Sequence, residues 1–217
     1  MDMEYRGGAA SQYPDIADSY PVRVEIPVNE NPNKLYAIPI AGMAIKAIMI
    51  IPFLIAWYIV FAIVALASLV FWIPVLFTGA YPEAGYTLMG GFIRWTTRLS
   101  CFMFGLTDKY PSFSFDDVDN RGVTIRFERN GAANRFWAIP VIGILVKLVI
   151  LIPHYLVLYV LGLVSGLLLY ISWIPVLFTG RYPTWGYTLF GGTIRWTARF
   201  YAYLFGITDV YPPFSLS

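Results

Sequence analysis

Cysteine, histidine and charged side chains are scarce in this sequence. Its 217 residues include one cysteine and one histidine, and 13% are charged, against roughly 25% in an average soluble domain. The single cysteine, Cys101, excludes a disulfide within the chain, and no Cys/His cluster of the kind that binds zinc can form. A net charge of +2 without a dense basic stripe excludes nucleic acid as a partner.

The motifs of catalysis are also missing. No two carboxylates lie together in an apolar stretch, where they could act as general acid and base. The chain has no Gly-Lys-Ser/Thr phosphate loop and no Gly-x-Ser-x-Gly nucleophile turn. We therefore predict that the protein is not an enzyme and needs no cofactor.

Apolar residues, in contrast, are abundant. Hydrophobic residues make up 58% of the chain, and aromatic residues 18%. Two long apolar runs, 35–77 and 136–179, contain one charged residue each, Lys46 and Lys147. Both runs exceed the ~20 residues that a membrane-spanning helix needs, which predicts an all-α integral membrane protein. Residues 1–19 are polar, lack the order of a signal peptide and predict a mobile tail.

The chain also contains an internal duplication. The segment from Trp72 to Gly79, Trp-Ile-Pro-Val-Leu-Phe-Thr-Gly, returns unchanged at 173–180. Of the 94 residues in 22–115, 41 are identical to the residue 101 positions later. An offset kept without insertion over that length predicts two tandem repeats with the same architecture.

Each repeat is expected to contain a short β-strand, a transmembrane helical hairpin and an interfacial amphipathic helix. Apolar and polar residues alternate in 22–26 and 123–127, which predicts strands on the cytoplasmic side. These strands pair with each other or with the Tyr-Pro tails after each repeat. The expected boundaries are repeat 1 at 20–115, with its hairpin at 36–79 and its amphipathic helix at 85–106; a linker at 116–122; and repeat 2 at 123–217, with its hairpin at 137–180 and its amphipathic helix at 186–207.

The hairpin is predicted from length. Forty residues in one helix would extend ~60 Å, twice the ~30 Å hydrocarbon core of a bilayer. We therefore expect two legs joined by an apex near 58–65 and 159–166, where Gly162 and Gly166 suit a break or a close helix contact. Two crossings per repeat place the polar face and both termini in the cytoplasm. One crossing per repeat, as in inverted-repeat transporters, stays open as the alternative.

The amphipathic helices carry the most suggestive polar side chains. Arg94 with Arg98, and Arg195 with Arg199, are spaced i, i+4, so each pair presents two guanidinium groups on one helix face. They predict an anion site for lipid phosphates or a partner's carboxylates; the alternative is surface arginine that extends from an interfacial helix to the headgroups. Four nearby glycines are expected to allow close packing of these helices: Gly90, Gly91, Gly191 and Gly192.

Five further polar residues are candidates for a structural or functional role. Lys46 and Lys147 predict either contact with lipid or a true internal site. Asp108 and Asp209 precede Tyr-Pro and are expected to brace the end of the amphipathic helix. His154 is not repeated in the first copy; it is a weak candidate for an axial metal ligand, and no metal site is predicted.

Three stretches of the second copy form a recognisable pattern: 177–183, Arg195-Trp196 with Arg199, and 207–214. The pattern resembles a family of small bacterial membrane proteins known as domain of unknown function 4389. The resemblance covers nearly all of 20–216 and is closer in the second copy, because the first has Ala80 where the pattern prefers Arg and Ser112 where it prefers Pro. It implies a location in the bacterial inner (cytoplasmic) membrane, and no activity or site residues.

Three functions follow as hypotheses. The first is a non-enzymatic integral membrane scaffold or accessory subunit that docks its apolar helices against a larger membrane complex. The second is a membrane-shaping or lipid-binding protein, whose apolar segments act as wedges in one leaflet. The third is a small transporter of an anion or lipid that uses Lys46, Lys147 and the arginines. The expected partners are membrane lipids, other membrane subunits or a second copy of the chain.

Overall fold

The computed structural model describes residues 20–117, 122–129, 132–139 and 141–217. The predicted tail at 1–19 and residues 118–121 of the predicted linker lie outside the described residues. Most of the described chain is helical, and the two repeats place their elements in the same order. The elements are β1 (Val22–Glu25), η1 (Lys34–Ala37), α1 (Ala41–Thr78), α2 (Glu83–Met103), β2 (Thr124–Phe127), η2 (Arg135–Ala138), α3 (Ile142–Ile150), α4 (Ile152–Thr179), α5 (Thr184–Gly186), the π-helical turn η3 (Tyr187–Gly191) and α6 (Gly192–Leu204).

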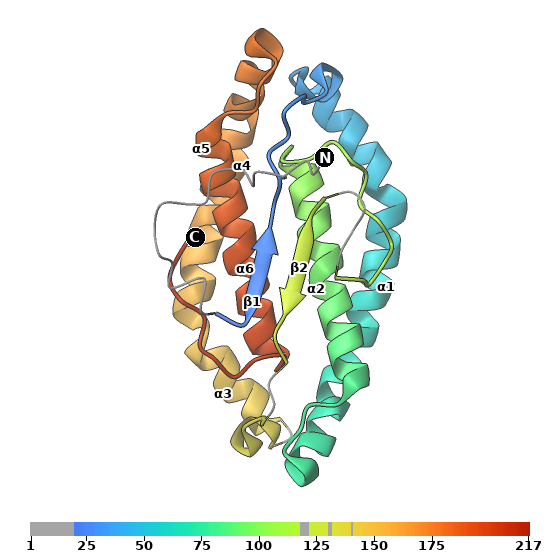
Figure 1. The fold of residues 1–217 in the computed structure, drawn as a ribbon, viewed down its shortest axis with the longest axis vertical. Helices are drawn as coiled ribbons and strands as arrows, with labels where there is room; N and C mark the ends of the chain where they lie inside the picture. Colours follow the sequence, from blue (N-terminus) through green and yellow to red (C-terminus); the bar gives the residue numbers. More distant parts are fainter. Residues whose placement is uncertain (1–19, 118–121, 130–131, 140) are drawn as a thin grey trace, which may run out of the picture.

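The repeats face each other across an approximate two-fold axis that points toward the viewer in Figure 1. The helices lie along the long axis of the molecule, and α1 runs down the view while α3 and α4 run up. At the centre, α2 packs against α6, with α1 beside α2 and α4 beside α6. The ribbon of β1 and β2 lies in front of α2 and α6, halfway along the long axis.

The two strands pair with each other, which confirms one of the two predicted pairings. They are antiparallel, and Val24 lies opposite Ile125 in the register. Val22 and Val24 are buried while Arg23 and Glu25 are exposed, so the alternation in the sequence separates a core face from an outer face. Two strands alone would be marginally stable; here the core face of the ribbon packs on the central helices.

The prediction of a helical hairpin in each apolar run is wrong. α1 continues from Ala41 to Thr78 without a turn near 58–65, and Pro52 and Pro74 lie inside it. The second run does break, but at Leu151, between α3 and α4 and not at 159–166. The break comes just before Pro153, which lies in the first turn of α4, where its missing N–H leaves no hydrogen bond unmade. The length argument rested on the thickness of a bilayer, and the chain itself has no turn signal at 58–65 that would end α1.

A tight turn precedes α1 and another precedes α3. Ile40 has φ +64° and Val141 has φ +66°, values that non-glycine residues rarely adopt. The N–H of Ala41 donates to the carbonyl of Pro39 at 2.7 Å, a bond that closes a three-residue turn. The turn brings Gly42 so close to Tyr36 that a Cβ there would lie 2.3 Å from the Tyr36 carbonyl oxygen. The chain therefore folds η1 back onto the start of α1.

Two of the described helices, α1 and α4, are long and apolar enough to cross a membrane. Only 22% of the most apolar window of each is buried inside the molecule. The core helix of a soluble protein would bury much more, so these helices leave most of an apolar surface without a partner among the described residues.

The amphipathic helices are present, with α2 close to the predicted range and the second copy divided among α5, η3 and α6. Their position differs from the prediction, because both faces of each helix are covered. The apolar face of α2 packs on α1, and its arginine face lies under β2 and the segment 112–117. We call α2 and α6 the inner helices, because other described segments cover both of their faces.

Candidate functional site

Lys46 lies inside a cage of aromatic rings. Its side chain is 1% exposed, and its Nζ donates to the carbonyl of Phe102 at 2.8 Å. The same Nζ lies 5.0 Å from the ring centre of Tyr36, 4.8 Å from that of Phe102 and 5.1 Å from that of Trp173. Two of the rings belong to the lysine's own repeat, and Trp173 comes from the other repeat.

Lys147 has the matching cage at the opposite end of the molecule. It is fully buried, and its Nζ donates to the carbonyl of Tyr203 at 2.9 Å. The rings of Trp72, Trp137 and Tyr203 surround it at 4.5–5.4 Å. One difference between the cages is an ion pair, because Lys147 Nζ lies 3.5 Å from Asp209 Oδ1. Of the two alternatives for these lysines, the structure favours the internal site over lipid contact.

The lysines complete the ends of the inner helices. Phe102 lies in the last turn of α2, and Tyr203 in the last turn of α6. Both carbonyls also accept from the N–H of a following glycine, Gly105 or Gly206, at 3.2 Å. They lie at the negative end of the helix dipole, where a buried cation is favourable. Aromatic faces stabilise a desolvated ammonium group further.

The tyrosines of the duplicated motif bind the opposite repeat in the same reciprocal way. Tyr81 donates to the carbonyl of Phe205 at 2.8 Å, and Tyr182 donates to that of Phe104. Beyond each carbonyl the chain turns at a glycine with positive φ. These glycines are Gly105 and Gly206, which lie against Trp173 and Trp72.

The sequence showed this motif but did not indicate that it binds the opposite repeat. Trp72, Tyr81 and their copies were visible as identities at a fixed offset. The identity of these residues at a fixed offset was the only indication of their function. A contact that forms twice across a two-fold axis requires both of its partner residues in each repeat.

Both aspartates hold a helix end, but a different one from the end predicted. Asp108 Oδ2 accepts from the backbone N–H of Asn33 at 2.6 Å, and Asp209 Oδ2 accepts from that of Asn134 at 2.7 Å. Asn33 and Asn134 are the N-caps of η1 and η2. The carboxylates thus fix the short helices that carry Tyr36 and Trp137 toward the lysines.

Arg94 and Arg195 bind the ribbon, each in the strand of the other repeat. Arg94 Nε donates to the carbonyl of Ile125 at 3.2 Å, and Arg195 Nε donates to that of Val24 at 3.2 Å. Because Val24 and Ile125 are register partners, the two arginines hold the ribbon at a single point from both sides. Arg94 also forms an ion pair with Asp117.

Arg98 and Arg199 bind the segment that follows each inner helix. Arg98 donates to the carbonyls of Ser114 and Asp116 at 2.7 and 2.5 Å, and Arg199 donates to that of Ser217. The prediction of lipid or partner contact is therefore corrected for Arg94, Arg98 and Arg199, which are 8%, 2% and 3% exposed. Folded backbone covers these side chains, and no local sequence pattern indicated that cover.

The predicted packing glycines divide into two groups. A Cβ on Gly91 would lie 2.4 Å from the Phe115 ring, and one on Gly192 would lie 2.5 Å from the Leu216 carbonyl oxygen, so these positions do pack closely. Gly90 and Gly191 have contacts at 3.2 and 3.4 Å. The prediction fails for Gly162 and Gly166, where a Cβ would meet no atom within 4 Å.

His154 occupies an aromatic packing position. Its ring stacks on Phe214 with 3.8 Å between centroids, and its Nδ1 accepts from Trp196 Nε1 at 2.9 Å. In repeat 1, Phe53 fills the corresponding place against Trp95. No three His, Cys, Asp or Glu side chains gather as a metal site in the described ranges. The indole N–H of Trp196 occupies Nδ1, while Nε2 is buried without a hydrogen-bond partner among the described residues.

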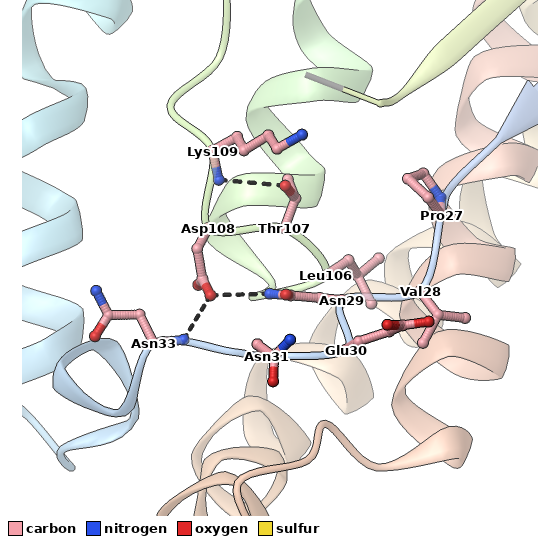
Figure 2. A pocket seen from close by; sticks show the side chains of 10 residues that line it. All are labelled: Pro27, Val28, Asn29, Glu30, Asn31, Asn33, Leu106, Thr107, Asp108 and Lys109. Carbon is pink, nitrogen blue, oxygen red and sulfur yellow. Dashed lines mark hydrogen bonds between the residues drawn. The ribbon is translucent and has the colours of Figure 1, made fainter. Parts of the chain in front are cut away.

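A cavity of about 470 Å³ lies between the loop after β1 and the end of α2 (Figure 2). Asp108 projects toward Asn29 and Asn33, and both hydrogen bonds drawn to it come from these residues. Lys109 extends away from that carboxylate. In this cavity Asp108 thus holds the loop after β1 through its bonds from Asn29 and Asn33.

The described fold defines a tandem-repeat helical protein with two helices of membrane-spanning length and composition. A family model, "Domain of unknown function (DUF4389)", matches residues 41–114 and 142–215. The chain belongs to this family, as a tandem pair of its domains. No curated protein and no solved structure matches the chain.

The lysine cages can be tested by charge removal. We expect Lys46→Met and Lys147→Met each to lower the free energy of unfolding by about 2 kcal/mol, because a buried carbonyl loses its charged donor and three rings lose their cation. The measurement is denaturation in detergent, followed by tryptophan fluorescence. Lys109→Met, at an exposed position, is the control and should change stability by less than about 0.5 kcal/mol. Equal stability of all three variants would contradict the role of the cages.

The two groups of glycines should respond to alanine with opposite signs. Gly91→Ala and Gly192→Ala should destabilise the protein by about 1–3 kcal/mol, because the new methyl group collides with Phe115 or Leu216. Gly166→Ala should stabilise it by up to about 1 kcal/mol, because alanine favours the helix and meets open space. The same denaturation assay measures all three, and a uniform sign would show that the packing is not as described.

Proposed function

We propose that this chain is a non-enzymatic membrane-shaping protein that lies flat in one leaflet of a bilayer. Its apolar helices α1, α3 and α4 lie among the acyl chains, the inner helices lie above them, and the β-ribbon faces water. The protein thereby adds volume to one leaflet and not to the other, as amphipathic wedges do.

The segregation of charge supports this proposal best. In α1, α3 and α4, all of whose residues the structure describes, the only Lys or Arg side chains are Lys46 and Lys147, and both are buried. The remaining surface of these helices consists of large apolar side chains, such as Leu66, Leu167 and Phe178. The outer face of the ribbon instead exposes charged residues: Arg23, Glu25, Arg126 and Glu128.

The position of the ribbon favours a flat orientation over an upright one. A 38-residue helix extends about 57 Å, well beyond a ~30 Å hydrocarbon core. If α1 stood upright, the ribbon, halfway along the molecule (Figure 1), would carry its charges to the bilayer centre. Each such charge costs roughly 2.5–3.5 kcal/mol on insertion scales. In the flat orientation the two-fold axis lies along the membrane normal, and all the charges of the ribbon stay in water.

The flat orientation keeps part of the topology expected from sequence. Both repeats present the ribbon to the same side, and we propose the cytoplasmic side of the bacterial inner membrane. Anion transport through the buried cations gains no support, because Lys46, Lys147 and Arg98 donate to carbonyl groups of the chain.

A scaffold or accessory subunit is the second candidate, and one observation favours it. The exposed face of α4 carries three tyrosines, Tyr155, Tyr159 and Tyr170, where α1 has Leu54, Tyr58 and Leu69. A phenol group within hydrocarbon favours a hydrogen-bond partner. A neighbouring membrane protein packed on α4 would supply one.

Labelling of single cysteines tests the flat orientation. In a Cys101→Ala background, Lys34→Cys places a thiol beside Gly180 at the end of α4, and Arg135→Cys places one beside Gly79 at the end of α1. These two helix ends lie at opposite ends of the long axis. We expect an impermeant maleimide to reach both from the same side of sealed membrane vesicles, together with Glu25→Cys on the ribbon. An upright chain would expose the two end positions on opposite sides, and that result would refute the orientation.

Vesicle remodelling tests the function. Reconstitution at rising protein-to-lipid ratio should reduce vesicle diameter. Leu66→Lys should weaken this effect, because a charge on α1 disfavours insertion by about 2.5–3.5 kcal/mol. Val28→Lys is the matched control, since Val28 is as exposed as Leu66 (67% against 69%) but lies outside the apolar helices. Vesicles whose size does not depend on the protein would remove the membrane-shaping function.

A further inference from the structure

The two repeats differ most clearly where the central helices meet α1 and α4. On the side of repeat 1, Trp57 and Phe61 of α1 stack at 5.3 Å, and both lie against Phe92 of α2, at 5.4 and 5.8 Å. These three rings close the space between α1 and the inner layer.

At the corresponding positions of repeat 2, all three rings are absent. Leu158 stands in the place of Trp57, Gly162 in that of Phe61 and Thr193 in that of Phe92. A cavity of about 200 Å³ takes their place, and Leu158, Gly162 and Thr193 all line it. The cavity is therefore an asymmetry between the copies, and it lies where repeat 2 has three other residues in place of the aromatic rings of repeat 1.

The cavity is apolar despite its hydroxyl groups. Six residues with a hydroxyl group line it, and two of them are Thr97 and Tyr201. The other four, Thr96, Ser100, Thr193 and Thr197, each donate to the carbonyl four residues earlier in the same helix, at 2.7–3.0 Å. The hydrogen atoms of these four hydroxyl groups are therefore engaged within the helices. An apolar cavity of roughly 150 Å³ stays free of water and accepts a hydrocarbon ligand, so this larger one suits a hydrocarbon better than water.

The cavity opens onto the surface that we place in lipid. Gly162 is exposed at its rim, and the neighbouring Tyr159 and Leu163 belong to the exposed apolar face of α4. A chain that enters at Gly162 would pass from the acyl region of the leaflet to the contact between α2 and α6 without crossing a charged group.

We infer that this cavity holds one acyl chain of a membrane lipid, in the place that the aromatic rings fill in repeat 1. The inference rests on the proposed membrane location. It gives the protein one specific lipid site, on the α4 side of the two-fold axis.

The experiment restores the missing ring. Gly162→Phe introduces the residue of repeat 1 at a position where a Cβ meets no atom within 4 Å, and Gly166→Phe places the same side chain one turn away, also in open space but outside the cavity lining. Native mass spectrometry after gentle extraction should find one retained lipid on the wild-type protein and on Gly166→Phe, and none on Gly162→Phe. Thr193→Phe fills the cavity from α6 and should also abolish retention.

Several results would overturn the inference. These are a wild-type protein without lipid, equal retention by Gly162→Phe and Gly166→Phe, a retained molecule other than a lipid, or a second copy of the chain whose contact is lost in Gly162→Phe. The labelling of Lys34→Cys and Arg135→Cys, repeated in the Gly162→Phe background, separates the two proposals. Unchanged same-side labelling with unchanged lipid retention would refute the lipid site alone.

Discussion

The structure depends on how the buried C-terminal ends of α2 and α6 are satisfied. Their last carbonyl groups lie inside the protein, where water cannot reach them. Lys46 and Lys147 add a charged donor to two carbonyls that also accept from the N–H groups of Gly105 and Gly206. A buried ammonium group in turn needs cover that tolerates charge. Trp173 and Trp72 provide it from the opposite repeat. Neither half can therefore complete its own inner helix alone, and this requirement couples the two repeats.

This coupling explains which features could be predicted from the sequence. A contact made twice across a two-fold axis leaves identical residues at one offset, so the duplication and the paired strands were predictable. The hairpins were predicted wrongly. An apolar run indicates that a helix lies in an apolar environment, but it does not indicate how the helix is oriented there. The cover over Arg94 and Arg98 was not predictable, because it comes from 112–117 and β2, which reach the arginines only after the chain reverses.

The arginines link the inner layer to the polar face. Arg94 and Arg195 meet the two strands at one register pair, so the ribbon is held exactly where the two-fold axis passes between the repeats. Such an arrangement keeps charged residues on one face and apolar helices on the other by construction. The proposed flat position in a leaflet rests on that geometry more than on the length of any single helix.

The tandem arrangement has a consequence that two separate copies would lack. In a symmetric pair of identical units, a residue that opens a cavity on one side opens it on the other as well, and the central contact is weakened twice. In a fused duplication the copies can differ. Phe61 keeps one side closed while Gly162 opens the other, and Phe53 and His154 differ in the same way within an otherwise shared aromatic cluster. The identical residues thus maintain the axis, and the divergent ones around it are where a specific role for this chain can arise.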